Sequence, residues 1–216
     1  MRHFQGLLPI LLSVLFLGSI SGLTYLRAQE LQGSSLFIPT LVFVGLYLLW
    51  IVLESKVATK EIGQEKTQID SFSLELYAFS RALVVLSGLY FAPHLLELHP
   101  LHYAGLSLFI VAIVFRLVAI RQLGQFYSHR VRVQSEHKII SQGPYRFVRH
   151  PAYTGMILSH LGFSLFFFNM WTLGFWALIH VPAVVYRILV EEKALFQIKG
   201  YPEYARNRKR IIPLLW

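Results

Sequence analysis

The stretch PAYTGMILSHLGFSLFFFNMWTLGFWALIHVPAVVYRILV, residues 151–190, is apolar along almost its whole length. It divides into two runs, 152–168 and 171–190, which are joined only by the residues FNMW. Each run comes close to the ~20 residues that an α-helix needs to cross a bilayer. Because so short a connection leaves room only for a tight turn, the stretch predicts a hairpin of two membrane helices.

Four more apolar runs precede this hairpin, at roughly 7–26, 36–53, 79–98 and 101–120. The composition agrees with them, because 55% of the 216 residues are hydrophobic and the mean hydropathy is +0.53. A soluble domain of this size needs more polar surface than that. We therefore predict an all-α, polytopic integral membrane protein with about five to six transmembrane helices.

The first apolar run has a second interpretation. The segment MRHFQGLLPILLSVLFLGSISG, residues 1–22, has the charged start and apolar middle of a signal peptide. Its hydrophobicity continues to Leu26, which is longer than the usual core of a signal peptide. We interpret it as a retained membrane helix.

The lysines and arginines indicate how the chain is oriented. If both termini are cytoplasmic, 18 of the 20 lysines and arginines fall on the cytoplasmic side, and only Arg27 falls outside. Arg116 lies within the fourth run, where we expect its side chain to snorkel to the inner surface. This asymmetry predicts cytoplasmic N and C termini. The net charge of +9 lies between apolar runs, so it favours membrane lipids over nucleic acid as the partner.

The residue inventory argues against a metal site. The chain has no cysteine, and His129, His137 and His150 do not have the spacing of metal ligands. We therefore expect neither a metal nor a disulfide. The absence of cysteine and the compact set of helices also favour a prokaryotic inner membrane. The sequence leaves open whether the chain is a monomer or a homo-oligomer.

The chain divides into a hydrophobic scaffold, residues 1–120, and a region with the chemistry-bearing residues, 121–216. The polar segment 54–71 is interpreted as a solvated connector. Gly124 is expected to end the fourth helix as a left-handed cap, and Pro151 to begin the fifth. His160, alone on the fifth helix, is interpreted as a packed histidine.

Polar side chains gather just before the hairpin, in GPYRFVRHPAYTG at residues 143–155. Tyr145 and Tyr153 offer ring faces and hydroxyls, and Arg149 and His150 offer donors. The turn and the helix start are also expected to leave backbone N–H groups that point at a ligand. Taken singly, the tyrosines could be interfacial belt residues and the arginines positive-inside anchors. Together they predict one wall of a polar pocket.

The other wall is predicted at the inner end of the sixth run. Arg187 and Glu191 are four residues apart and so share one face of a helix, and Glu192 follows. An ion pair within the helix would explain the spacing. Ionisable residues at membrane depth are costly, however, and usually face a cavity or a partner. The two carboxylates are therefore interpreted as part of the pocket.

These motifs, in this order, resemble those of the isoprenylcysteine carboxyl methyltransferase family. The resemblance is carried by HKIISQGPYRFVRHPAYTG at 137–155, EEKALFQIKGYPEY at 191–204 and RIIP at 210–213. It covers about residues 115–213, whereas the first 100 residues match only as generic membrane helices. It implies an intramembrane enzyme that uses S-adenosyl-L-methionine, with a cytoplasmic-face cofactor pocket formed by the C-terminal half.

The resemblance also implies roles for individual positions. Arg187 would bind the carboxylate of the substrate, and Glu191 would act with it in the catalytic centre while contacting the cofactor; we add Arg149 as a donor to the substrate. The cofactor contacts would be Gln134, His137, Lys138, Ile139, Ile140, Tyr145, His150, Pro151, Ala152, Tyr153 and Glu191. The implied reaction is methyl transfer to a lipophilic carboxylate such as that of isoprenylcysteine, with the acceptor coming from the bilayer.

Three alternatives remain at the level of the sequence. Related methyltransferases act on other acceptors, such as a phospholipid amine or a thiol. The NADPH-dependent sterol reductases have a similar R-H-x-x-Y-x-G stretch, but their tryptophan-rich lead-in is missing and Met156 stands where they have an acid after the glycine. The third alternative is a membrane protein without catalysis, in which Arg187 and Glu191 only stabilise the fold.

Overall fold

The computed structural model describes residues 2–59, 72–92, 97–128, 139–213 and 216. Within these ranges the chain is helical apart from turns, short irregular segments and one isolated parallel β-bridge. The elements are α1 Arg2–Glu30, α2 Phe37–Thr59, α3 Ser73–Phe91, α4 Pro100–Leu123, η1 Gly124–Phe126, η2 Gly143–Arg146, α5 Pro151–Phe166, α6 Met170–Phe175, η3 Trp176–His180, α7 Val181–Leu195 and α8 Tyr201–Arg206. The predicted all-α class is confirmed.

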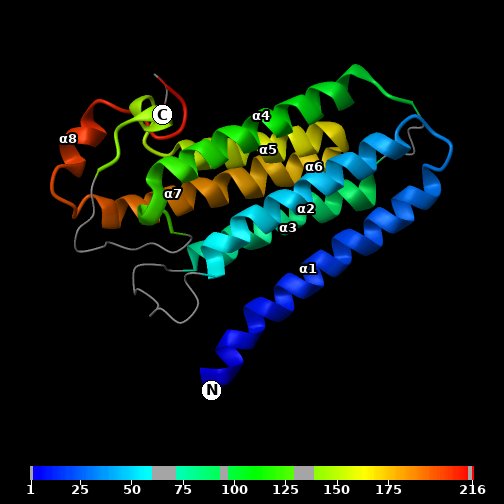
Figure 1. Cartoon of the computed structure of the whole chain (residues 1–216), viewed down its shortest axis with the longest axis horizontal. Helices are drawn as coiled ribbons and strands as arrows, with labels where there is room; N and C mark the ends of the chain where they lie inside the picture. Colours follow the sequence, from blue (N-terminus) through cyan, green and yellow to red (C-terminus); the bar gives the residue numbers. More distant parts are fainter. Residues whose placement is uncertain (1, 60–71, 93–96, 129–138, 214–215) are drawn as a thin grey trace.

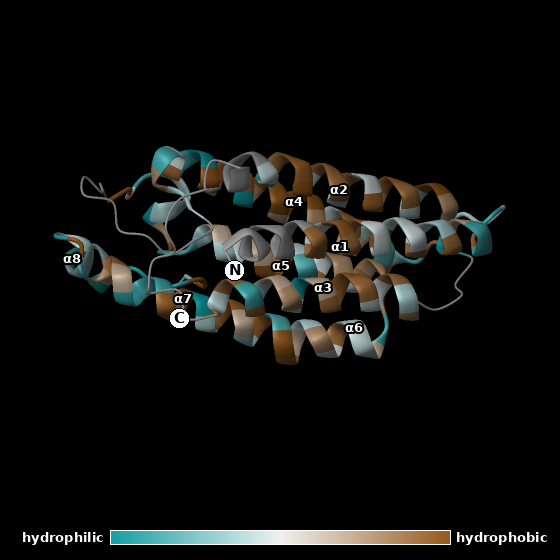
Figure 2. Ribbon diagram, turned by 90° about the horizontal axis from the view of Figure 1, so that it is seen from below, coloured by the Kyte–Doolittle hydropathy of each residue, from teal (hydrophilic) through white to brown (hydrophobic). Residues whose placement is uncertain are grey.

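The long helices lie side by side in one elongated bundle, with α1 along its edge (Figure 1). Five segments are long and apolar enough to cross a membrane: Leu11–Glu30, Phe37–Ser55, Ser73–Phe91, Pro100–Phe126 and Met170–Leu195. Apolar residues cover most of the length of these helices, and hydrophilic residues gather toward the bundle ends (Figure 2). The chain is therefore an integral membrane protein, as predicted.

The predicted hairpin is present, and its second arm is longer than expected. α5 ends at Phe166, and Asn169 begins α6 by accepting a hydrogen bond from the backbone N–H of Thr172 at 2.8 Å. α6, η3 and α7 then follow without a break from Met170 to Leu195. The wider π-helical turn η3 lies just before Pro182, which has no backbone N–H to continue the regular pattern of hydrogen bonds.

Glycines allow α4 and α5 to pack with their backbones almost in contact. A Cβ atom at Gly105 would lie 2.6 Å from the backbone nitrogen of Phe166, and one at Gly162 would lie 2.6 Å from that of Phe109. At Gly155 the obstacle is the Cβ of Arg116, also at 2.6 Å. Three glycines over the shared length therefore join the two helices into one rigid unit.

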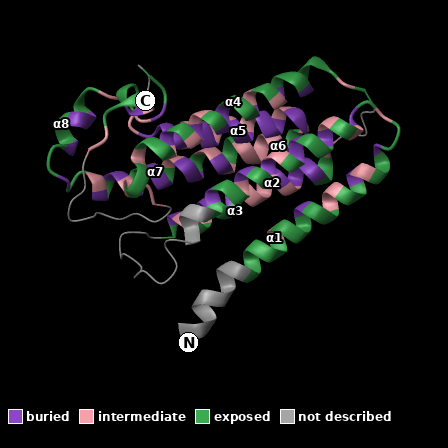
Figure 3. Ribbon diagram, viewed as in Figure 1, coloured by how far each residue is buried: buried purple, intermediate pink, exposed green. Residues whose placement is uncertain are grey.

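The interior of the bundle combines an aromatic core with buried polar groups. The buried residues lie mainly along the central helices of the bundle (Figure 3). His160 is completely buried, and its Nδ1 lies 3.0 Å from the carbonyl oxygen of Met156, so the prediction of a packed histidine is confirmed. The ring of His180 lies 4.5 Å away between centroids, and its Nδ1 lies 3.0 Å from Oγ of Ser80.

Two expectations about charged residues were wrong. Glu54 is not part of a solvated connector, because it lies within α2 and is buried. Trp50 Nε1, one turn earlier in the same helix, donates a hydrogen bond to its carboxylate at 2.5 Å. Arg116 does not snorkel to the surface either. Its guanidinium donates to both carboxylate oxygens of Glu54, at 2.6 and 2.9 Å, and 2% of the residue is exposed. Because Glu54 compensates the charge of Arg116 inside the bundle, the Arg116 side chain does not have to extend to the lipid headgroups.

The two termini lie at the same end of the bundle, together with α8 and the start of α5 (Figure 1). At the opposite end, Arg27 is buried and donates to backbone carbonyls at the end of α3, among them Leu89 at 3.0 Å and Ala92. It also pairs with Glu30 at 2.7 Å. Arg27 thus completes the C-terminus of a neighbouring helix, whose last carbonyls have no partner within the helix.

The predicted boundaries of the C-terminal half largely hold. Pro151 is the first residue of α5, and α4 ends at Leu123. Gly124 follows with φ +55° but ψ −120°, so its φ is positive as expected while the conformation is not the left-handed helical one. The chain then turns through η1 before the described part stops at residue 128.

Candidate active site at one end of the bundle

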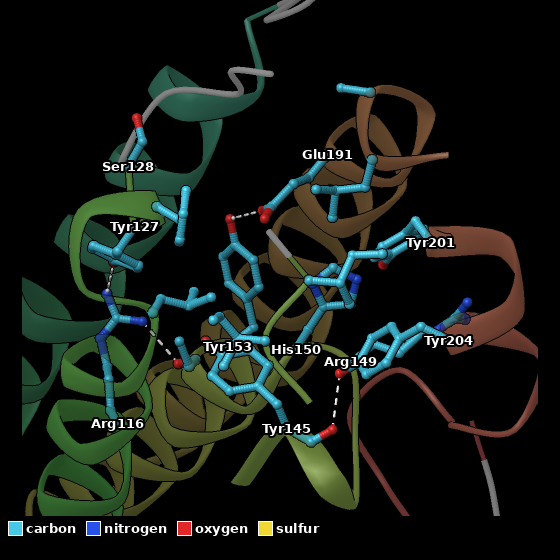
Figure 4. Close-up of a pocket in the computed structure, with 17 residues that line it drawn as sticks. Arg116, Tyr127, Ser128, Tyr145, Arg149, His150, Tyr153, Glu191, Tyr201 and Tyr204 are labelled. Atoms are coloured by element: carbon cyan, nitrogen blue, oxygen red, sulfur yellow. Dashed lines mark hydrogen bonds between the residues drawn. The ribbon is translucent and has the colours of Figure 1, made fainter. Parts of the chain in front are cut away.

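An open cavity lies at the end of the bundle that holds both termini. Its walls come from the ends of α4 and α7, the start of α5, η1, η2 and α8 (Figure 4). The predicted polar stretch 143–155 and the predicted glutamate on α7 therefore meet around one cavity.

Glu191 faces this cavity from α7. The hydroxyl of Tyr153, in the first turn of α5, donates to its carboxylate at 2.7 Å (Figure 4). This hydrogen bond links the two walls that the sequence predicts. One oxygen of the carboxylate is engaged by Tyr153, and the group retains further lone pairs with which it can accept hydrogen bonds from a ligand.

Glu192, the next residue, does not line the cavity. It is buried, and its carboxylate pairs with Arg149 at 3.1 Å, with His150 Nε2 at 3.2 Å and with Arg210 Nε at 2.8 Å. The expectation that both carboxylates form the pocket wall was therefore wrong for Glu192. A helix turns about 100° per residue, so adjacent side chains cannot share a face. Glu192 instead ties the segment before α5 to α7 and to the C-terminal tail.

The C-terminal tail also holds the polar stretch through its backbone. The N–H groups of Arg149 and His150 donate to the carbonyls of Lys209 and Arg210, at 2.8 and 2.9 Å. These two N–H groups, which precede the start of α5, are thus used within the protein rather than left for a ligand. Thr154 Oγ1 donates to the carbonyl of Ile211 at 2.9 Å.

Arg116 contributes to the floor of the cavity. Besides its pair with Glu54, it donates to the carbonyl of Ala152 at 2.8 Å and to the hydroxyl of Tyr127 at 3.0 Å (Figure 4). Ala152 and Tyr127 both line the cavity. One guanidinium therefore fixes the start of α5 relative to the segment after α4.

Three tyrosines around the cavity keep their protons at neutral pH. Burial raises the pKa of the Tyr145 and Tyr201 hydroxyls well above the usual range, and burial raises the pKa of Tyr204 to about 12. The Tyr204 hydroxyl donates to the carbonyl of Tyr145 at 2.9 Å, which fixes α8 against η2 (Figure 4). The cavity therefore contains protonated phenols that act as hydrogen-bond donors.

The structure brings most of the predicted site residues together. Those that line the cavity are Ile139, Ile140, Tyr145, Arg149, His150, Ala152, Tyr153 and Glu191. Pro151 is buried and begins α5 without lining the cavity. Gln134, His137 and Lys138 lie outside the described residues, as does the extended piece expected at 130–133.

Arg187 also lies outside the cavity lining. It is buried one helical turn deeper in the bundle than Glu191, and its Nη1 donates to Oγ of Ser73 at 2.6 Å. Ser73 begins α3, so Arg187 connects α7 to the start of α3. Its position is on the membrane side of the cavity.

Several lining residues were not predicted from the sequence. They are Arg116, Leu123, Phe126, Tyr127, Ser128, Ala194, Leu195, Tyr201 and Tyr204. The two tyrosines of α8 form the Y-x-x-Y pattern in the resemblance, and that pattern could have assigned them. Nothing in the sequence around Arg116 indicates that it pairs with an acid 62 positions earlier. No group of three or more histidine, aspartate or glutamate side chains suited to a metal occurs within the described ranges.

Comparison with known proteins agrees with the geometry. Residues 105–197 match a model of the isoprenylcysteine carboxyl methyltransferase family. A probable protein-S-isoprenylcysteine O-methyltransferase of rice, Oryza sativa subsp. indica, is 31% identical over 127 residues, which cover 57% of this chain and 66% of the relative. Protein-S-isoprenylcysteine O-methyltransferase B of Arabidopsis thaliana is 27% identical over 161 residues, covering 71% and 82%.

A third relative, from the beetle Tribolium castaneum, is 30% identical over 58% of this chain and 46% of its own length. The chain thus spans about half to four fifths of these relatives. All three are eukaryotic, so they lend no support to the expected prokaryotic origin.

A solved structure supports the fold over nearly the whole chain. It is that of a eukaryotic intramembrane Ras methyltransferase, with a TM-score of 0.56 and 21% identity over 99% of this chain and 90% of the other. The structural match extends to the N-terminal helices, for which the sequence shows only generic membrane character. The family model, the relatives and the shared fold agree, and the chain belongs to the isoprenylcysteine carboxyl methyltransferase family.

Proposed function

We propose that the protein transfers a methyl group from S-adenosyl-L-methionine to the carboxylate of a lipophilic acceptor such as isoprenylcysteine, giving a methyl ester. The observation that carries this proposal is the joining of Glu191 and Tyr153 in one cavity at the end of an intramembrane bundle, in a chain of this family. The cavity opens where both termini lie, and we propose that this end is cytoplasmic, in agreement with the distribution of lysine and arginine.

The lining of the cavity suits this cofactor. When bound, S-adenosyl-L-methionine supplies a sulfonium-activated methyl group. The aromatic faces of Tyr145 and Tyr153 suit a sulfonium cation, since a desolvated cation–π contact stabilises by ~2 kcal/mol. The Glu191 carboxylate can accept hydrogen bonds from ribose hydroxyls or from the amino group. Apolar residues such as Ile139 and Ile140 provide a surface for the adenine ring.

The acceptor side needs no general base. A terminal carboxylate has a pKa of about 3.3–3.7, so it is already ionised at neutral pH. The protein then accelerates the reaction by placing the two reactants in line and by excluding water. The cavity borders on the membrane-spanning part of α4 and α7, which supports an acceptor that reaches the cofactor from the bilayer.

We assign Arg187 to hold the carboxylate of the acceptor. It lies one turn deeper in the bundle than Glu191, so an acceptor that arrives from the hydrocarbon side meets Arg187 before the cavity. A guanidinium and a carboxylate form a strong, oriented pair. Arg149, the other predicted donor to the substrate, is engaged by Glu192 and lies on the α8 side of the cavity.

The proposal is tested by a transfer assay on purified protein in detergent, with methyl-labelled S-adenosyl-L-methionine and a farnesylated cysteine acid. We expect label in the acceptor that mild base releases as methanol, because only an ester is labile under these conditions. Base-stable label would indicate an amine or thiol acceptor instead. Absence of transfer, despite cofactor binding in the same preparation, would rule out this acceptor.

A further inference from the structure

Two polar groups on the α8 side of the cavity have no hydrogen-bond partner among the described residues. The Nε–H of Arg149 and the hydroxyl of Tyr201 are buried and have no hydrogen-bond partner within the described part of the chain. Both residues line the cavity, with 9% of the Arg149 side chain and 5% of Tyr201 exposed. Buried donors are nearly always paired in native proteins, because an unpaired one costs about 1–3 kcal/mol. Two such donors in one cavity indicate a place for a ligand.

The chemistry of this corner selects the kind of ligand. Both groups are donors: the guanidinium cannot accept, and the phenol keeps its proton because burial raises the pKa of Tyr201. The charges beside these donors are unevenly paired. The carboxylate of Glu192 serves two guanidinium groups, those of Arg149 and Arg210, so this cluster has one positive charge in excess, while the carboxylate of Glu191 on α7 supplies the negative charge of the cavity. A corner with donors and excess positive charge fits an anionic group, whereas a neutral hydroxyl would also need an acceptor.

We propose that the corner formed by Arg149 and Tyr201 binds the carboxylate of the amino-acid end of S-adenosyl-L-methionine, while Glu191 receives the ammonium group of the same end. This assignment rests on the proposed function and specifies which part of the cofactor occupies which part of the cavity. The amino-acid end is a zwitterion, and the cavity presents Arg149 and Glu191 to it from two different elements (Figure 4). The adenosine part then lies toward η1 and the apolar residues.

The assignment predicts that the Tyr201 hydroxyl contributes to ligand binding but not to the stability of the fold. A hydroxyl that stabilises the fold loses a hydrogen bond when it is removed, and the fold becomes less stable. The Tyr201 hydroxyl has no partner in the described protein, so the substitution Tyr201→Phe removes no such bond. We therefore expect the substitution to weaken ligand binding without lowering the unfolding temperature of the ligand-free protein.

The experiment measures dissociation constants of the full chain in detergent for two ligands, by calorimetry. S-adenosylhomocysteine has the amino-acid end, and 5′-methylthioadenosine lacks it. For Tyr201→Phe we expect about a tenfold weaker affinity for S-adenosylhomocysteine, as for a lost hydrogen bond to a charged group, and an unchanged affinity for 5′-methylthioadenosine. Arg149→Lys, which keeps the charge beside Glu192 but removes the Nε–H, is expected to show the same selectivity.

Tyr77→Phe is the matched control. Its hydroxyl is also buried without a partner in the described chain, but Tyr77 does not line the cavity. We expect this variant to bind both ligands like the wild type. An equal loss of both ligands in Tyr201→Phe, or an unchanged affinity for S-adenosylhomocysteine, would overturn the assignment while leaving the methyltransferase proposal in place. Failure of the wild type to bind either ligand would contradict the proposal that the protein uses S-adenosyl-L-methionine.

Discussion

At the scale of single residues, two neighbouring glutamates have different roles because they lie on different faces of α7. Glu191 faces the cavity and accepts a hydrogen bond from Tyr153. Glu192 is buried between Arg149, His150 and Arg210. The first is available to a ligand, and the second holds the surrounding segments together. Their substitutions should therefore have different consequences.

We expect Glu191→Ala to weaken cofactor binding by about tenfold or more, because it removes a charged hydrogen-bond acceptor from the cavity. The unfolding temperature should change little, since within the described residues the carboxylate is held by a single hydrogen bond, from the Tyr153 hydroxyl at the cavity edge. Calorimetry with S-adenosylhomocysteine measures the first quantity and thermal unfolding the second. A variant that binds the cofactor like the wild type would remove Glu191 from the site. Glu192→Ala is the comparison, for which we expect a loss of stability.

Arg187→Ala should abolish methyl transfer while leaving cofactor affinity largely intact. The reason is that Arg187 lies deeper in the bundle than the cavity and does not line it. The measurement is a transfer assay combined with a binding titration on the same preparation. Parallel losses of transfer and of cofactor binding would contradict a role on the acceptor side. Ser73→Ala is a useful control, because it removes the observed partner of Arg187 without removing the charge.

Arg116→Met should destabilise the protein by about 3–5 kcal/mol, because Glu54 would remain as a buried charge without its partner. The double variant Glu54→Leu/Arg116→Met should be less damaging than Arg116→Met alone, because it leaves no unpaired charge. Thermal unfolding in detergent measures both. Additive effects of the two substitutions would show that the pair is not coupled.

The site was predictable from the sequence where its residues are close together in the chain. Tyr145, His150 and Tyr153 come from one short motif, and Glu191 from a second motif with charged residues at membrane depth. Arg116 could not be found in this way, because what determines its role is a carboxylate on another helix. Glu191 faces the cavity and Glu192 is buried because of how α7 is rotated about its axis. This rotation is set by the packing of α7 against its neighbours, which the sequence alone does not give.

At the scale of elements, the α4–α5 pair is the most tightly packed unit of the bundle. Gly105, Gly155 and Gly162 allow the two backbones to approach. The cavity floor rests on this pair, because Arg116 on α4 holds the carbonyl of Ala152 at the start of α5. Separation of these helices would therefore disturb the site as well as the fold.

Gly162→Ala should destabilise the protein by about 1–3 kcal/mol or more, as for overpacking of a core, because the added Cβ would lie 2.6 Å from the backbone of Phe109. Gly174→Ala provides the control within another helix. A Cβ at Gly174 meets nothing within 4 Å, so the higher helix propensity of alanine should leave stability unchanged or raise it by about 1 kcal/mol. Equal unfolding temperatures for the two variants would show that the close packing is not a constraint.

The elements were predictable in number and order but less so in length. Hydrophobicity indicates which segments enter the membrane, and Pro151 and Gly124 indicate where two helices begin and end. The continuation of the last long helix to Leu195 was not predicted, because its final turns are polar and carry Glu191 and Glu192. The π-helical turn at Trp176–His180 was not predicted either, since its cause depends on the backbone hydrogen bonds around Pro182.

At the scale of the whole molecule, the cavity is built from distant parts of the chain. Residues of α4, α5, α7 and α8 line it, and the tail after α8 returns to pair with the segment before α5. The scaffold predicted at 1–120 contributes as well, through Arg116 and its partner Glu54. The bundle and the site are therefore one structure, in which the same helices span the membrane and hold the ligand.

The short helix α5 does not set the thickness of the membrane around the protein. Its 16 residues extend about 24 Å, whereas the hydrocarbon core of a bilayer is about 30 Å thick. The cavity begins where α5 begins, so its floor lies within the bundle. Every residue of α5 is buried or half-buried, so neighbouring helices surround it and the bilayer meets the longer helices instead.

The short length of α5 should therefore cause no hydrophobic mismatch. In vesicles of phosphatidylcholines with increasing acyl chain length, we expect methyl transfer and the affinity for S-adenosylhomocysteine to change little over the thicknesses that the longer helices match. A rate that is highest in bilayers as thin as α5 and falls steadily in thicker ones would contradict this expectation. If it holds, the outer helices shield the site from the thickness of the membrane around the protein.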